Sequence, residues 1–167
     1  SLIINKTLTL SDATATNDTV TLNGASTLDA NVVEVIGDSV VSGDTFDSTQ
    51  FLANILELKD NVSLTQNGAN IIAESLFLQS GSVFTVNDGD VQVTDTLAKG
   101  GTINLNNSAT YSMTRGFAFN DFDLTLNIDS TSRWNVGSKA IMQKGTTTVI
   151  NNDGQFNLFG ELWGNGN

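Results

Sequence analysis

The chain has 167 residues, with 18 Asp and Glu against 7 Lys and Arg, which gives a formal net charge of −11 at pH 7. This length suits one domain with its own core, and this charge argues against nucleic acid or an anionic membrane surface as a partner. The chain contains no His, Cys or Pro, which excludes Ser-His-Asp and Cys-His catalysis, Cys/His metal sites and disulfides.

Uncharged polar residues dominate the composition: there are 21 Thr, 20 Asn, 15 Gly and 15 Ser, and only 15% of the residues are charged. Asn, Asp and Gly favour turns, whereas Thr, Val, Ile and Phe favour strands. No apolar run is long enough to cross a bilayer, so we expect no membrane insertion by this segment. The composition predicts an all-β fold with many tight turns.

Short apolar alternations separated by polar turns follow one another along the chain, and they group into seven units of three. The predicted strands of each unit are, in chain order, 8–10, 20–22 and 27–28; 33–35, 40–41 and 51–53; 56–58, 62–64 and 71–73; 76–78, 83–86 and 91–93; 103–105, 110–113 and 117–119; 126–128, 133–136 and 140–142; and 148–150, 155–158 and 161–163.

The spacing of these units predicts how they are arranged. The first strands end at Leu58, Leu78, Leu105, Ile128 and Ile150, in steps of roughly 20–27 residues, which are typical of solenoid repeats. We attribute the longest step, from Leu78 to Leu105, to extra residues around 94–101. Three short strands in each step predict a right-handed parallel β-helix (β-solenoid) of about seven coils, in which each strand pairs with its equivalent in the next coil. It forms a single domain over residues 1–167, less regular over 1–50 and regular over 51–167.

Two other all-β arrangements are less consistent with the pattern. A left-handed helix of hexapeptides needs apolar anchors at every sixth position, which holds from Leu56 to Val62 but fails from Val62 to Ile71. An antiparallel sandwich also has many short strands, but it does not require aromatic residues to recur at one phase of the repeat.

The corners between strands are rich in residues that tolerate left-handed backbone angles. They include Lys59–Asn61, Ser80–Ser82, Asn106–Ser108 and Asn151–Gly154. Asn residues stacked on one another can form hydrogen-bonded ladders. The lack of Pro fits strands that are paired on both sides, because Pro would remove a backbone donor.

Four aromatic residues recur at one phase, each at the sixth position after the end of the preceding strand: Phe84, Tyr111, Trp134 and Phe156. They predict one stack along the axis, either as an internal aromatic ladder or as a platform for sugar rings. The apolar residues two positions later favour the internal ladder; these are Val86, Met113, Val136 and Leu158. The residues between, Thr85, Ser112, Asn135 and Asn157, then point outward.

Carboxylates are the main groups left for acid-base chemistry. Asp121 and Asp123 alternate on one predicted strand, with Asp129 further along, and paired carboxylates can cleave glycosidic bonds. The same pattern fits a strand with Phe122 turned inward and its polar residues outward, and the nearest cation in the sequence is Arg115. We therefore predict no catalytic residues and no enzymatic activity.

Two turns gather oxygen ligands of the kind that Ca²⁺ prefers. They are Asn87–Asp90 and Asn151–Gly154. Neither matches an EF-hand loop or the glycine-rich nonapeptide of calcium-binding β-rolls. Turn chemistry explains both, so we predict no metal site and no cofactor.

Apolar triplets, Asn/Ser/Asp/Gly corners and the lack of Cys over residues 33–167 resemble the right-handed β-helical passenger domains of bacterial autotransporter adhesins, within the pectin-lyase-like fold group. The resemblance implies export, an extracellular or cell-surface location, and a role in adhesion, aggregation or as a stalk. Host-cell or glycan surfaces are the partners that it implies.

Three functions remain open at this point. The first is a segment of a surface adhesin, acting as a structural and adhesive rod. The second is a self-assembling filament or sheath subunit, because the apolar start at 2–4 and the uncapped end at 162–167 leave strand edges that can pair with another copy. The third is a polysaccharide-binding or polysaccharide-cleaving β-helix, such as a tailspike segment.

Overall fold

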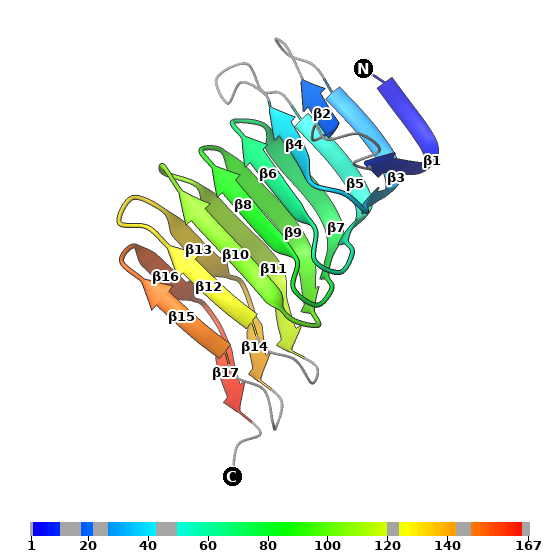
Figure 1. Ribbon diagram of the computed structural model, residues 1–167. Helices are drawn as coiled ribbons and strands as arrows, with labels where there is room; N and C mark the ends of the chain where they lie inside the picture. The colour runs from blue at the N-terminus through cyan, green and yellow to red at the C-terminus, as the bar shows by residue number, and fades with distance from the viewer. Residues whose placement is uncertain are drawn as a thin grey trace.

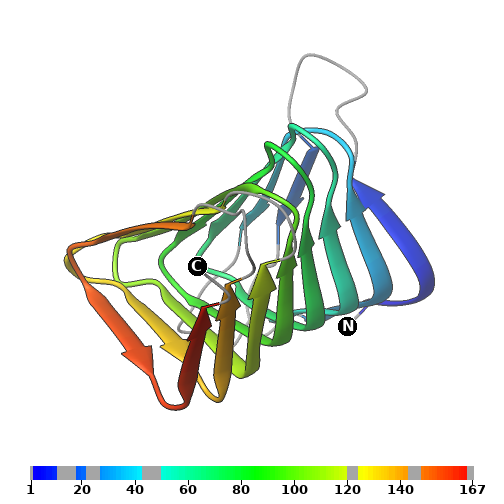
Figure 2. The same cartoon turned by 90° about the horizontal axis from the view of Figure 1, so that it is seen from below.

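The computed structural model describes residues 2–10, 18–21, 27–42, 50–119, 124–142 and 148–164. Within these ranges the regular structure is entirely β-strand, and the strands form two parallel sheets. Successive coils stack side by side along one axis, with the two termini at opposite ends of the stack (Figures 1 and 2). The predicted all-β fold, a parallel β-solenoid, is confirmed.

Sheet A contains the longer strands and sheet B the shorter ones, and the chain alternates between them. Sheet A is made of β1 (Leu2–Leu10), β3 (Thr27–Val35), β5 (Gln50–Leu58), β7 (Asn70–Leu78), β9 (Asp90–Ala98), β11 (Thr110–Phe119), β13 (Arg133–Val136), β14 (Lys139–Met142), β16 (Gln155–Leu158) and β17 (Glu161–Gly164). Sheet B is made of β2 (Asp18–Thr21), β4 (Ser39–Ser42), β6 (Ser63–Asn67), β8 (Val83–Asn87), β10 (Gly101–Asn106), β12 (Leu124–Ile128) and β15 (Thr148–Asn152).

Four long strands of sheet A, β3, β5, β7 and β11, each contain two of the predicted short strands. In β7, Ile71 and Ala73 are buried, Glu74 is exposed, and burial resumes at Leu76 and Leu78. The alternation therefore skips one residue, and both halves of the strand keep an apolar face toward the interior. In the later coils the two halves are separate strands, β13 with β14 and β16 with β17.

The register of sheet A gives the length of each coil. Phe51, Ile71, Val91 and Tyr111 are aligned partners on successive strands, so three consecutive coils have equal lengths. Five regular turns begin at β5, β7, β9, β11 and β13, and the pairs β1–β2 and β3–β4 precede them. The predicted count of about seven coils is therefore higher than the number of regular turns.

The long step predicted between Leu78 and Leu105 is wrong as a coil length. Leu78 pairs with Ala98 in sheet A, whereas Leu105 pairs with Val86 in sheet B. The two leucines lie on different faces of the solenoid, so the distance between them is not one coil. The stretch 94–101 that was assigned to an insertion contains the second half of β9 and the start of β10.

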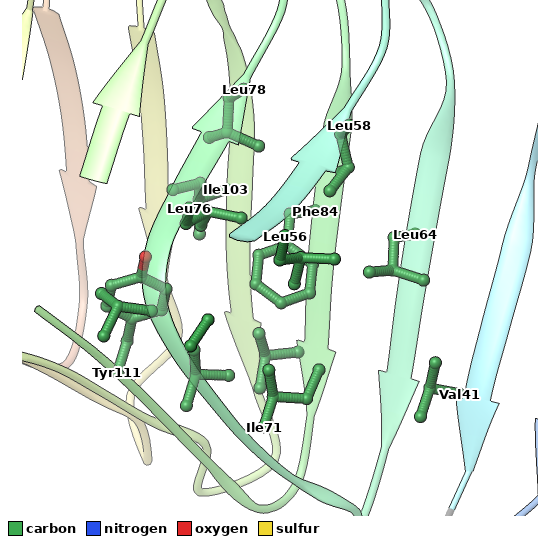
Figure 3. Packing of buried hydrophobic residues seen from close by; sticks show 14 of the residues in the cluster. Val41, Leu56, Leu58, Leu64, Ile71, Leu76, Leu78, Phe84, Ile103 and Tyr111 are labelled. Atoms are coloured by element: carbon green, nitrogen blue, oxygen red, sulfur yellow. The ribbon is translucent and has the colours of Figure 1, made fainter. Parts of the chain in front are cut away.

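The interior is a continuous apolar core built from the inward residues of both sheets (Figure 3). Its largest fully buried side chains include Trp134, Tyr111, Phe51 and Phe84. Burying aliphatic and aromatic area of this kind supplies most of the free energy of folding, at about 25 cal/mol per Å². Each coil contributes one layer of this core, and the coils on either side cover that layer.

Three of the four predicted corners contain turns, whereas Asn151 and Asn152 of the fourth belong to β15 and a bend follows at Asp153 and Gly154. Asn61 and Asn107 have φ angles of 58° and 57°, and Gly81 has a φ of 70°. A Cβ added at Gly81 would collide with Asn61 Oδ1 of the preceding coil. Close stacking of the corners and a left-handed backbone together favour glycine there.

Candidate functional site

Three of the four predicted aromatic residues form the expected column. Tyr111 pairs with Trp134, and Trp134 pairs with Phe156. The Tyr111 and Trp134 rings are stacked, with centroids 4.3 Å apart and 15° between the planes. Neither of these two side chains is more than 1% exposed, so their part of the column is an internal ladder and offers no ring face to a sugar.

Phe84 was wrongly placed in that column. It lies on β8 in sheet B, where its partners are Leu64 and Ile103. Figure 3 shows its ring among the aliphatic side chains of the core. The error follows from the mistaken long step, because the sixth position after Leu78 reaches a different face from the sixth position after Leu105.

A buried polar pair interrupts the apolar interior. Thr96 takes the position that Leu76 occupies one coil earlier, and its Oγ1 lies 2.7 Å from the Tyr111 hydroxyl. Burial raises the pKa of Tyr111, and this hydrogen bond opposes the increase only in part. The pair satisfies two hydroxyls that would otherwise be costly in the core.

Gln66 is a second polar residue inside the core. It is fully buried on β6, in a column whose other members include Val41 and Val86. Its Nε2 donates to the carbonyl oxygens of Ala69 and of Asp88, the latter at 3.1 Å in the next coil. From inside the core, Gln66 therefore hydrogen-bonds to two successive corners.

The outer side of sheet B, which we call the sheet B face, is uncharged over strands β6, β8, β10, β12 and β15. Its outward residues lie in three columns: Ser63, Val83, Thr102, Thr125 and Val149; Thr65, Thr85, Asn104, Asn127 and Asn151; and Asn67, Asn87 and Asn106. Within a column, equivalent residues lie about 4.8 Å apart, the spacing of paired strands. The result is a regular polar surface on an otherwise acidic chain.

Side-chain hydrogen bonds join these residues into ladders along the axis. Asn104 donates to Thr85, Asn127 to Asn104 and Asn151 to Asn127, at 3.2, 2.7 and 2.7 Å. A parallel ladder runs through Asn67, Asn87 and Asn106, at 3.1 and 3.0 Å. The predicted Asn ladders are confirmed.

Sheet A carries a ladder of the same kind on its C-terminal coils. Asn135 donates to Ser112 at 3.1 Å, and Asn157 donates to Asn135 at 2.9 Å. These residues point outward, as the alternation predicted. Hydrogen bonds between side chains of neighbouring coils thus supplement the backbone pairing on both sheets.

A groove on the outer side of sheet A was not predicted from the sequence. The groove has a volume of about 370 Å³ and is lined by Asp29, Leu52, Ala53, Asn54, Ile72, Ala73, Glu74 and Thr94, from strands β3, β5, β7 and β9. A signal for it exists in the sequence, because Phe51-Leu52-Ala53 and Ile71-Ile72-Ala73 are continuous apolar runs rather than alternations. Leu52 and Ile72 are the outward members of those runs, and both are half-buried.

Of the carboxylates considered for acid-base chemistry, the described residues include Asp129 alone. Asp121 and Asp123 lie outside the part of the chain that the structure describes. Arg115 is exposed, and its Nη1 lies 3.7 Å from Asp95 Oδ2. Asp129 lies at the corner after β12, where its carboxylate accepts hydrogen bonds from backbone amides.

Asp129 is held by several donors. Its Oδ1 accepts from the Thr131 amide and hydroxyl, both at 2.9 Å, and its Oδ2 accepts from the Asn107 amide of the preceding coil at 2.7 Å. Burial alone would raise its pKa, but these hydrogen bonds outweigh it and lower the pKa to about 2. Asp129 is therefore a charged corner acceptor.

The two turns with clustered oxygen atoms have structural roles. In the first, Asp88 and Gly89 have φ angles of 62° and 103°, and the Asp88 carbonyl accepts from the Gly68 amide at 3.0 Å. In the second, Asn151 belongs to the sheet B ladder. Among the described residues, no three His, Cys, Asp or Glu side chains are grouped so as to hold a metal ion.

Comparisons with protein-family models, with curated proteins and with solved structures give no match for this chain. Over the ranges that the structure describes, there is no helix that is long and apolar enough to span a membrane.

Proposed function

We propose that this β-solenoid is a non-enzymatic, extracellular rod with a structural and adhesive role, as a segment of a bacterial surface adhesin or autotransporter passenger. One observation carries the proposal. The outward amide and hydroxyl side chains of the sheet B face are hydrogen-bonded from coil to coil, from Thr85 to Asn151. Such ladders stiffen a rod along its axis and hold its surface groups in fixed positions.

The sheet B face is the proposed adhesive surface. It is uncharged, whereas the chain as a whole carries a net charge of −11, so it can approach a neutral hydroxyl-rich surface without burying charge. Amides that are already ordered lose little entropy when a partner binds. Neutral glycans on a host cell or matrix have the matching donors and acceptors.

The adhesive role can be tested with coated beads on immobilised neutral glycans and on epithelial cells under flow. We expect the chain to retain beads, and we expect Thr85→Lys combined with Thr125→Lys to reduce retention. Thr110→Lys combined with Thr114→Lys on sheet A is the matched control, because it makes the same chemical change on another face. Equal loss in both variants, or no retention by the unaltered chain, contradicts the proposal.

A second candidate function is end-to-end assembly into a filament. The last coil that the structure describes exposes three large apolar residues, Val149, Ile150 and Phe159, to 42%, 37% and 72%. Electron microscopy of the purified chain at high concentration tests this candidate. Eight strand levels in sheet A give a repeat of roughly 38 Å along a fibre, and short discrete rods at every concentration contradict it.

A further inference from the structure

The groove across β3, β5, β7 and β9 combines an apolar floor with two carboxylates. Leu52 and Ile72 form the floor. Asp29 is aligned with Leu52 on the neighbouring strand, and Glu74 follows Ile72 by two positions on β7. Neither carboxylate has an ion pair or a side-chain hydrogen bond within the described part of the chain. A half-buried aliphatic pair beside these two carboxylates is a surface on which a partner can bury apolar area and supply positive charge.

Three of the other carboxylates of these strands lie beside cations. Glu34 and Glu57 share Lys59, at 3.4 and 2.7 Å from its Nζ, and Asp95 pairs with Arg115. Asp90, at the start of β9, is exposed but does not line the groove. Within the described residues, Asp29 and Glu74 are therefore the carboxylates without an ion pair that lie beside the apolar floor.

The chemistry of the groove selects a cationic side chain on an aliphatic stem. Lysine and arginine side chains can cover aliphatic surface with their methylene groups while their charged ends reach a carboxylate. We propose that this groove docks an extended basic segment of another protein. The inference does not depend on the adhesive role of the sheet B face, because the groove lies on the other sheet.

The positions of the two carboxylates predict the spacing of the basic residues. Asp29 is on β3 and Glu74 is on β7, two strand spacings away, which is roughly 9–10 Å along the axis. Glu74 is also two residues further along its strand than Ile72, the residue aligned with Asp29. In a polyproline II segment, residues i and i+3 lie on one side and about 9.3 Å apart. Basic residues at every third position therefore match the axial separation, and long lysine side chains can reach across the offset along the strand.

The probe for the test is a synthetic peptide of repeated Lys-Pro-Pro units, titrated into the full chain at low salt. Methyl NMR shifts of Leu52 and Ile72 report where it binds and whether each variant is folded. We expect Asp29→Asn and Glu74→Gln each to weaken binding about two- to fivefold. Ile72→Thr, which removes part of the apolar floor, should also weaken it.

Matched controls separate this site from general attraction to an acidic protein. Asp60→Asn removes the same charge at an exposed corner and should leave the affinity unchanged. A peptide of the same composition with its lysines grouped at one end should bind more weakly. The proposal is overturned if Asp60→Asn weakens binding as much as Glu74→Gln, if the grouped peptide or free spermine binds equally well, or if the Leu52 and Ile72 methyl signals do not move.

Discussion

The Trp134 ring stacks on the Tyr111 ring of the preceding coil, with centroids 4.3 Å apart and 15° between the planes. Trp134→Ala removes this contact and leaves a large cavity, so we expect it to reduce the free energy of unfolding by about 3–5 kcal/mol. Urea denaturation measures the loss. Trp134→Phe keeps an aromatic ring and should cost less, and an unchanged stability in Trp134→Ala would disprove the internal position.

The Thr96–Tyr111 hydrogen bond gives a second prediction. Thr96→Val leaves the Tyr111 hydroxyl buried without its partner and should cost about 1–3 kcal/mol. Adding Tyr111→Phe removes the remaining hydroxyl, so the double variant should be less destabilised than the sum of the two single variants. If the destabilisation of the double variant equals the sum of the destabilisations of the two single variants, the two hydroxyls do not interact.

Alkaline unfolding should depend on Tyr111. Because burial raises its pKa in the folded chain above the ordinary value of 10, ionisation favours the unfolded state once the pH exceeds about 10. The stability is therefore intact below that pH and falls above it. Tyr111 is the only tyrosine, so tyrosinate absorbance follows it directly. Tyr111→Phe should resist alkaline unfolding better, and tyrosinate formation before unfolding would contradict the prediction.

Acid stability should depend on Asp129. Its pKa is lowered to about 2 in the folded chain from an ordinary value of 3.8, so its contribution is present above pH 3.8 and disappears as the pH falls toward 2. Asp129→Asn removes that dependence. The difference in unfolding free energy between the two proteins should be largest at neutral pH and small near pH 2. A difference that does not change with pH would exclude the ionised carboxylate as the cause.

The sheet B ladder should contribute to stability through Asn127, which donates to Asn104 and accepts from Asn151. Asn127→Ala removes both hydrogen bonds and should cost about 1–2 kcal/mol more than Thr125→Ala, an outward substitution on the same strand. Thermal or urea unfolding of both variants measures this difference. If the two variants are equally stable, the ladder does not hold the coils together.

Much of the fold could be predicted because the alternation of inward apolar and outward residues in each half of a long strand is visible in the sequence. Runs such as Leu76-Phe77-Leu78 identify inward positions, and Asn or Gly at the corners identifies the turns. The coil boundaries were harder to predict, because triplets on sheet A and sheet B have the same apolar pattern. Only the register distinguishes the faces, and Thr96, where Leu76 stands one coil earlier, hides the constant period of the central coils.

The groove and the buried polar contacts were harder to predict for a different reason. Alternation identifies which way a residue points, but it does not say which side chain from another coil lies beside it. Alternation after Val62 and Leu64 places Gln66 inward, but it does not identify the Ala69 and Asp88 carbonyls to which the Gln66 side chain donates. Asp29 and Glu74 are far apart in the sequence, and only the stacking of β3, β5 and β7 brings them to one groove.

Three consecutive coils have the same length, so a folding chain could mis-stack by looping one of them out. The aliphatic columns would tolerate this error, because Leu, Ile and Val replace one another with little loss. The Thr96–Tyr111 pair would not, because each hydroxyl needs the other from one particular coil and is costly to bury without it. This buried hydrogen bond therefore distinguishes neighbouring coils and makes one order of stacking more stable than its near copies.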